Sequence, residues 1–270
     1  MQAKRSLTLG GRLALVVLAS LSLAACDVVV SSMNMSGKAQ DTWSRTYPIA
    51  PNGRIELINT NGQIEVLATA GQQIEVQAER IARANTDEAA KEVLKDIQIK
   101  EDVSGDVVRL ETVLPRGGGM RRGGEVRYFL KVPASISVQV HNTNGQVRVD
   151  GVKGAVTAET TNGGVRGQNL SGDVDASTTN GGVEIEMLSV GANGVKADTT
   201  NGGITLVVPE NVKAQFKATT RNGGISLTGL TVDGESSRTR VEGTINGGGP
   251  SISLGTTNGG IRVRAGASAR

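Results

Sequence analysis

Hydrophobic and polar residues alternate along most of the chain after residue 53, which is the pattern of half-buried β-strands. The alternation is clear in four early segments, at residues 54–57, 64–66, 74–78 and 107–113. Each segment places aliphatic residues on one side of the backbone and charged or polar residues on the other. We therefore expect a domain built from strands that each bury one face.

A short phrase then recurs, TTNGG at residues 160–164, 178–182, 199–203 and 256–260, with near-copies elsewhere. From Asn144 to Asn222 the repeat asparagines are 18, 18, 21 and 21 residues apart, and the steps through the degenerate Asn246 to Asn258 are 24 and 12. Such spacing is the signature of a repeat architecture. The repeat asparagines are Asn61, Asn144, Asn162, Asn180, Asn201, Asn222 and Asn258.

Apolar residues stand six and four positions before most of these asparagines and three and five positions after them, so each unit reads as strand, Asn-Gly corner and strand. A chain of hairpins fits this pattern locally. Hairpins, however, would leave one apolar face uncovered, whereas a solenoid closes its faces onto each other and stacks coils about 4.8 Å apart. We therefore predict an all-β fold, a single-stranded β-helix (β-solenoid) with repeated TTNGG corners.

The residue types in the TTNGG repeat also suggest what holds the coils together. Aligned threonine and asparagine side chains can hydrogen-bond from coil to coil as ladders. The alanine found four residues before several of the asparagines suits a thin core, and the second glycine is expected to leave the turn unobstructed.

Two segments break the strand pattern. Ala89, Ala90, Val93, Leu94 and Ile97 recur at helical spacing, which predicts one short amphipathic helix at residues 86–96. Asn85 with Glu88 resembles a capping box at its start. The Gly- and Arg-rich stretch 115–124 lacks the ending of a phosphate-binding loop, so we interpret it as a loop between strands 106–113 and 125–132.

The N-terminus has the features of an export signal. A basic start is followed by an apolar run at residues 13–23, which is too short to span a bilayer, and then by Leu-Ala-Ala-Cys. This ending resembles the lipobox of bacterial lipoproteins. We predict a signal peptide at 1–25, a lipidated Cys26 and tether at 26–43, and the repeat domain at 44–265. Asp27 resembles a signal for retention in the inner membrane, so we expect a lipid anchor that faces the periplasm, with the outer membrane as the alternative.

Charge and composition narrow the classes of partner. The full chain has a formal net charge of +3, but residues 1–25 hold three of the 29 basic side chains and none of the 26 acidic ones. The predicted mature chain is therefore neutral, which gives no reason to expect nucleic-acid binding. Aromatic residues make up only 2% of the chain, so the usual platforms of carbohydrate-binding modules are scarce.

Candidate chemistry is sparse. The single histidine, His141, has no second histidine or cysteine with which to form a zinc site, apart from the predicted lipidated Cys26. Asp173 with Asp175, and Glu184 with Glu186, alternate with buried positions and are expected on solvent-facing strand surfaces. We expect no catalytic residues, no metal and no cofactor.

The TTNGG repeat, the early Asn59-Thr60-Asn61-Gly62 copy and the export signal together resemble the bacterial adhesin-like family of β-strand-repeat proteins, also called the toast-rack type. The resemblance covers roughly residues 45–265 and implies a β-helix-like stack of strands and a role at the cell envelope. We expect a non-catalytic, lipid-anchored scaffold that binds an envelope protein or a glycan. The alternatives are a polysaccharide hydrolase or lyase, and a self-assembling structural protein.

Overall fold

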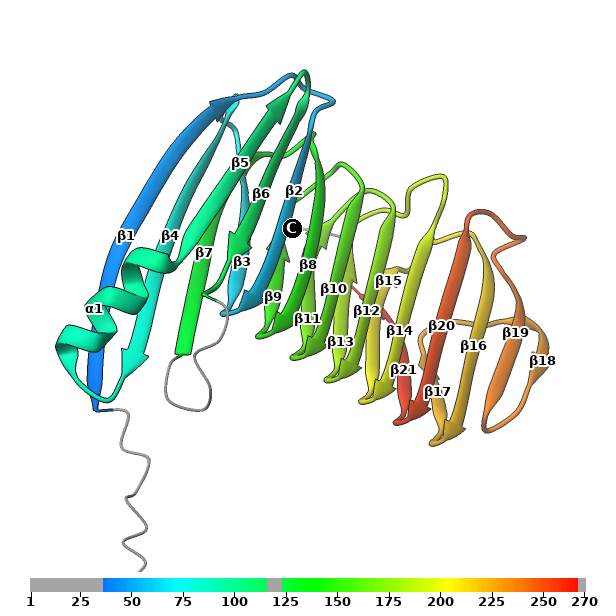
Figure 1. Cartoon of the computed structure of the whole chain (residues 1–270). Helices are drawn as coiled ribbons and strands as arrows, with labels where there is room; N and C mark the ends of the chain where they lie inside the picture. The colour runs from blue at the N-terminus through cyan, green and yellow to red at the C-terminus, as the bar shows by residue number, and fades with distance from the viewer. Residues whose placement is uncertain (1–35, 116–122, 267–270) are drawn as a thin grey trace, which may run out of the picture. The chain divides into compact units, whose positions relative to one another are not determined.

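The computed structural model describes residues 36–115 and 123–266, which form one compact unit of strands with a single helix, α1 (Asp87–Asp96) (Figure 1). The strands belong to two large sheets that do not close into a barrel, so the predicted all-β class is confirmed. Predicted Cys26, Asp27 and the signal peptide lie outside the described residues, as does most of the Gly- and Arg-rich loop.

The first sheet has ten strands among the described residues. Most pair in parallel, and β1 and β4 add antiparallel pairs at one end. In spatial order the strands are β1 (Gly37–Pro48), β4 (Gln73–Ala84), β7 (Gly123–Pro133), β3 (Ile64–Thr69), β9 (Val147–Asp150), β11 (Val165–Leu170), β13 (Val183–Met187), β15 (Ile204–Pro209), β21 (Ile261–Gly266) and β17 (Ile225–Thr228).

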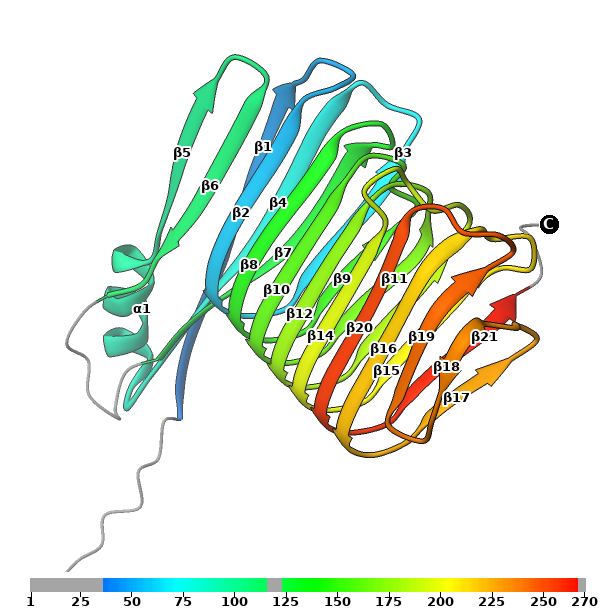
Figure 2. The same ribbon diagram turned by 90° about the vertical axis from the view of Figure 1, so that its right-hand side faces the viewer.

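The second sheet has eleven strands in the described part of the chain, and it faces the viewer in Figure 2. It is also mainly parallel, with antiparallel pairs at both ends. In spatial order the strands are β18 (Asp233–Ser236), β19 (Arg240–Ile245), β16 (Ala214–Asn222), β20 (Ser251–Asn258), β14 (Val195–Asn201), β12 (Val174–Asn180), β10 (Val156–Asn162), β8 (Ser137–Asn144), β2 (Arg54–Asn61), β6 (Val107–Val113) and β5 (Gln98–Ser104).

Each repeat unit contributes one strand to each sheet. β10 ends at Asn162 in the eleven-stranded sheet, and β11 begins at Val165 in the ten-stranded sheet. The two strands that flank such a corner therefore lie in different sheets and do not pair with each other, which excludes the hairpin interpretation. The equivalent strands of neighbouring units pair in register, asparagine beside asparagine.

The order of the coils in the stack differs from their order in the sequence. The last repeat, β20 and β21, lies between the β14–β15 coil and the β16–β17 coil. Asn258 consequently stands between Asn201 and Asn222. The irregular spacing after Asn222 reflects this insertion, because the chain forms the antiparallel β18–β19 hairpin against β16 before it returns.

The core is thin and almost entirely aliphatic. The alanines four residues before the asparagines are at most 1% exposed, and Val165, Val183, Ile204 and Ile261, three residues after them, are at most 3% exposed. Phe216 is buried among them, as its place in the repeat predicts. Small residues at this layer let the two sheets approach closely, so burial of many aliphatic groups supplies the main stabilisation. The buried alanines are Ala158, Ala176, Ala197 and Ala218.

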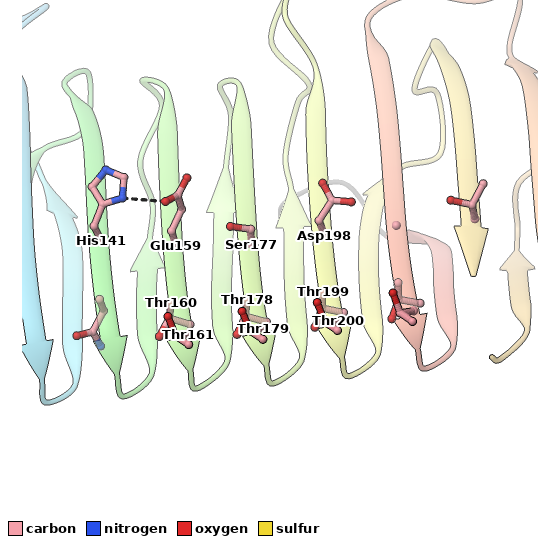
Figure 3. Close-up of a pocket in the computed structure, with 15 residues that line it drawn as sticks. His141, Glu159, Thr160, Thr161, Ser177, Thr178, Thr179, Asp198, Thr199 and Thr200 are labelled. Carbon is pink, nitrogen blue, oxygen red and sulfur yellow. Dashed lines mark hydrogen bonds and ion pairs between the residues drawn. The ribbon is translucent and has the colours of Figure 1, made fainter. Parts of the chain in front are cut away.

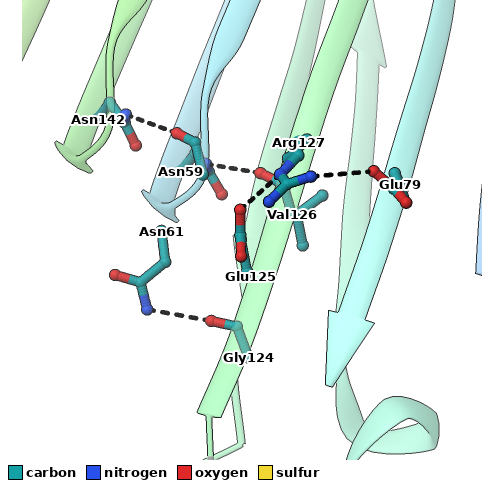
Figure 4. Close-up of polar contacts among 9 residues, drawn as sticks. Asn59, Asn61, Glu79, Gly124, Glu125, Val126, Arg127 and Asn142 are labelled. Atoms are coloured by element: carbon teal, nitrogen blue, oxygen red, sulfur yellow. Dashed lines mark hydrogen bonds and ion pairs between the residues drawn. The ribbon is translucent and has the colours of Figure 1, made fainter. Parts of the chain in front are cut away.

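The corner asparagines form one continuous chain of hydrogen bonds. The Nδ2 group of each asparagine donates to Oδ1 of the asparagine in the neighbouring coil, over 2.7–2.9 Å. All six bonds point the same way, and at the end of the row Asn61 donates to the backbone carbonyl of Gly124 (Figure 4). The order along the stack is Asn222, Asn258, Asn201, Asn180, Asn162, Asn144 and Asn61.

The threonines act differently from the predicted ladder. The first threonine of each phrase is buried, and its hydroxyl donates to a glycine carbonyl in the corner of the neighbouring coil, as Thr178 does to Gly163 over 2.8 Å. In the first coils asparagines take this position, and Asn59 donates to Val126 and Asn142 to Gly62 (Figure 4). These buried threonine and asparagine side chains therefore bond to the backbone of the neighbouring coil and not to each other, because each points into the corner where a backbone carbonyl lies within reach.

The structure also corrects two predicted boundaries. β1 begins at Gly37, inside the segment 26–43 predicted as tether, and pairs with β4 over its whole length. Its alternation is weak in the sequence because polar Asp41 lies on the same face as Trp43 and Tyr47, where it is partly buried and bound to Arg80. The predicted helix is present, but its N-cap is Thr86, whose side chain accepts from the backbone N–H of Ala89, and not Asn85.

The two threonines of one phrase offer a matched test of the corner bonds. Thr178→Val keeps the shape of the side chain but leaves the Gly163 carbonyl without its donor, so we expect the free energy of unfolding to fall by about 1–2 kcal/mol. Thr179→Val changes an exposed residue and should alter stability by less than about 0.5 kcal/mol. Urea unfolding followed by circular dichroism measures both. Equal effects of the two variants would contradict the assigned role.

The two glycines of a corner provide a second matched pair. A Cβ on Gly181 would lie 2.0 Å from the carbonyl oxygen of Gly163, whereas one on Gly182 would lie 3.4 Å from its nearest neighbour. The first glycine, and not the second, is therefore required by the stack. We expect Gly181→Ala to lower the free energy of unfolding by about 1–3 kcal/mol and Gly182→Ala to be tolerated. A stable Gly181→Ala protein in the same urea assay would show that the coils can separate locally.

Candidate functional site

A groove of about 610 Å³ crosses the outer face of the eleven-stranded sheet beside the corners. It passes over β8, β10, β12, β14, β20 and β16. Figure 2 shows these six strands side by side in the sheet. We call it the corner groove. Its defining residues lie three positions before each repeat asparagine, where side chains point out of the sheet (Figure 3). They are His141, Glu159, Ser177, Asp198, Gly255 and Thr219.

The groove exists because this row contains small residues in the middle. Ser177 and Gly255 leave space where the other coils carry longer side chains. Beside them runs a row of outward threonines from the four coils in the middle of the groove, which forms a second line of hydroxyl groups (Figure 3). Because both rows stand on paired strands, their spacing is fixed by the sheet. The outward threonines are Thr161, Thr179, Thr200 and Thr257.

One end of the groove carries a histidine held by two neighbours. Nδ1 of His141 lies 2.9 Å from Oε2 of Glu159 on the next strand, and Nε2 lies 2.8 Å from Nε2 of Gln139. A neutral imidazole satisfies both contacts if Nδ1 donates to the carboxylate and Nε2 accepts from the amide. The ring is therefore fixed in orientation at the groove wall (Figure 3).

Asp198 lies near the middle of the groove and has an altered acidity. Burial raises the pKa of its carboxyl group, Asp175 adds to the rise, and the nearby ammonium of Lys196 opposes it. Lys196 Nζ lies 3.4 Å from Asp175 and 3.7 Å from Asp198. The carboxylate leans over the next coil, where a Cβ on Gly255 would be 2.4 Å from its Oδ1. About half of the Asp198 side chain remains exposed, so it is open to a ligand.

The acidic pairs singled out in the sequence do not form a site together. Asp173 accepts from the backbone and side chain of Asn193 and so holds a connecting loop. Glu184 pairs with Arg166 on the ten-stranded sheet, and Glu186 lies on that same sheet, far in topology from Asp175. The side chains of the corner asparagines hydrogen-bond to one another along the stack, so their amide groups are already engaged.

No local sequence pattern indicates the corner groove directly. Ser177, Asp198 and Gly255 become neighbours only when the coils are placed in register, and the last of them joins through the out-of-order insertion of β20. Aligning the repeats by their asparagines and comparing the third residue before each would have brought out His141, Glu159 and Asp198 together.

Within residues 36–115 and 123–266, histidine, cysteine and carboxylate side chains form no group of three or more that could hold a metal ion. In the same ranges, α1 is too short and too polar to cross a membrane, and no other helix there could do so.

The unusual acidity of Asp198 leads to a titration test. Replacing Lys196 by methionine removes the neighbouring positive charge that favours ionisation, so the pKa of Asp198 should rise further above its usual value of 3.8. Carboxyl chemical shifts followed by NMR across the acidic range would measure it. Lys217→Met is the control, since Lys217 pairs with Glu242 instead. An unchanged Asp198 pKa in Lys196→Met would contradict this charge coupling.

Comparison with known families and solved structures shows which proteins this chain resembles. The family model of the Toastrack DUF4097 domain matches residues 91–264, well over half of the chain. A candidate cell adhesion protein from Clostridium sporogenes ATCC 15579 is similar in structure, with 15% sequence identity, a TM-score of 0.48, and coverage of 84% of this chain and 100% of that one. A candidate adhesin from Bacteroides fragilis NCTC 9343 shows 13% identity, a TM-score of 0.39, and coverage of 83% and 97%.

A candidate lipid-binding protein from Parabacteroides distasonis ATCC 8503 has 9% identity and a TM-score of 0.33, with coverage of 85% of this chain and 95% of that one. No curated protein matches the sequence. The family model, its extent and the two-sheet stack agree with one another, and the chain belongs to the Toastrack DUF4097 family.

Proposed function

We propose that this protein is a lipid-anchored, non-catalytic scaffold of the bacterial cell envelope that presents the corner groove as an adhesin-like binding surface. The observation that carries the proposal is the groove itself, a polar depression of about 610 Å³ built on six paired strands. Binding groups on strands of a rigid scaffold are held more accurately than groups on loops. The asparagine chain beside the groove adds to that rigidity.

A second candidate function is polysaccharide hydrolysis, which one observation favours. Asp198, with its raised pKa, and Glu159 stand on β14 and β10, two strand spacings apart, or roughly 10 Å between backbones. Inverting glycosidases use an acid and a base at a comparable separation, about 6.5–9.5 Å between carboxyl groups. We prefer binding because Glu159 is engaged by His141 and because half of the Asp198 side chain is exposed to solvent.

The far end of the stack disfavours the self-assembling alternative. The eleven-stranded sheet ends there in the β18–β19 hairpin, whose edge strand β18 has four residues, all exposed. The hairpin carries a charged cluster in which Arg240 pairs with Glu235 and Glu242. Short, charged edge strands resist pairing with another chain, so open-ended stacking of copies is disfavoured at this end.

The proposed anchor is Cys26, at the end of the Leu-Ala-Ala-Cys sequence. Ten residues separate Cys26 from Gly37, the first residue of β1. Fully extended, they reach at most about 35 Å, which would keep the N-terminal end of the stack near the membrane surface. Asp27 favours the inner membrane in this proposal, with the groove facing the periplasm.

Substitution of the proposed lipid attachment site tests the anchor. We expect Cys26→Ala to move the protein from the membrane fraction to the soluble periplasmic fraction, because one cysteine would carry all the acyl chains. Cell fractionation, with metabolic labelling by an alkyne fatty acid, measures the change. Ser32→Ala in the predicted tether is the control and should remain labelled and membrane-bound. Unchanged membrane association of Cys26→Ala after a high-salt wash would remove the anchor from the proposal.

A further inference from the structure

We propose that the ligand of the corner groove is an uncharged, linear polysaccharide that lies along the stack and crosses the strands. This inference rests on the proposed function of the groove as a binding surface. It names the ligand class, which follows from the length of the groove, its hydrogen-bonding groups and its charge.

The length of the groove suits a polymer. It crosses six neighbouring strands, and at about 4.8 Å per strand this is roughly 24 Å from the first to the last. A compact metabolite would occupy only a part of it. The outward threonines recur on the four neighbouring strands β10, β12, β14 and β20, so successive units of a linear ligand meet the same hydroxyl group at each of these steps.

The chemistry of the lining suits sugar hydroxyl groups. Threonine and serine hydroxyls both donate and accept hydrogen bonds, and ionised carboxylates accept only. Sugar hydroxyls can satisfy both kinds of group. Asp198 in particular leans into the space left by Gly255 and stays about half exposed, so adjacent hydroxyls of one sugar ring could donate to its two carboxylate oxygens.

An extended peptide fits the groove less well. Peptides that bind to sheets commonly add a strand at a free edge, where backbone N–H and C=O groups are available. The groove instead lies on the face of the sheet, over β10, β12 and β14, whose backbones are already paired on both sides. Only side chains are left to recognise a ligand there.

Charge disfavours anionic polymers at this site. The groove is lined by two carboxylates, those of Glu159 and Asp198, and by no lysine or arginine. The nearest ammonium, on Lys196, is shared between Asp175 and Asp198. A polymer that carries carboxylates or phosphates would meet repulsion without a compensating cation, whereas an uncharged glycan would not.

Affinity electrophoresis of the full-length protein, extracted from membranes in a polyoxyethylene detergent, tests the inference. Native gels would contain laminarin, galactomannan, dextran or hydroxyethyl cellulose as uncharged probes, and alginate or polygalacturonate as anionic ones. We expect retardation by at least one uncharged probe and none by the anionic probes. Retardation only by anionic probes, or by no probe at all, overturns the proposal, and the Cys26 anchor would be unaffected by that result.

Three variants locate the binding. Gly255→Leu projects a side chain into the groove, and its Cβ displaces only the flexible end of Asp198, so the fold should persist. Asp198→Asn keeps the shape and removes the charge. We expect both to weaken binding about tenfold or more, Gly255→Leu because its side chain blocks the groove and Asp198→Asn because it removes the charge from a hydrogen-bond acceptor. Ser226→Leu, exposed on the ten-stranded sheet, should bind as the unsubstituted protein does.

Two further outcomes test whether the corner groove is the binding site and whether the protein cleaves its ligand. If circular dichroism shows that all variants are folded and the retarding probe binds Gly255→Leu as well as it binds the unsubstituted protein, the corner groove is not the site. If the probe is cleaved, as shown by new reducing ends, and cleavage is lost in Glu159→Gln and Asp198→Asn, the glycan assignment stands and the non-catalytic function is replaced by hydrolysis.

Discussion

The contact between one corner and the next is the interaction on which the rest of the structure depends. At each corner, the first glycine lets the backbone of one coil approach the carbonyl of its neighbour, with no room for a Cβ. The buried threonine then bonds to that carbonyl, and the asparagine beside it bonds to the next asparagine. These three contacts fix the register between coils. With the register fixed, small aliphatic side chains are enough to fill the core.

The same register produces the corner groove. Residues that share a position in the repeat but not a neighbourhood in the sequence, such as Glu159 and Asp198, are brought to one face at strand spacing. The outward positions carry different side chains from coil to coil, and some of these also pair across coils, as His141 does with Glu159. The fold thus separates two tasks: the corners hold the coils together, and the outer rows decide what the face can recognise.

Much of the fold could be predicted because the repeat carries it. The strand–corner–strand unit, the helix near residue 87 and the burial of Phe216 all follow from periodicity. Three features could not be predicted. The alternation of β1 is interrupted by Asp41, a partly buried residue that pairs with Arg80. The bonding partner of each buried threonine is a backbone carbonyl, and the neighbour of β14 comes from the end of the chain. Each depends on contacts between distant segments, which a local pattern does not encode.

The out-of-order position of the last coil has a consequence for how the chain can be assembled. Strands β16 and β17 are made before β20 and β21, yet they contact the earlier coils only through them. The native stack therefore cannot be completed beyond β14 and β15 until the final segment is in place. A chain that ended before residue 251 would lack β20 and β21, so β16 and β17 would lose the strands that pair them with the rest of the stack.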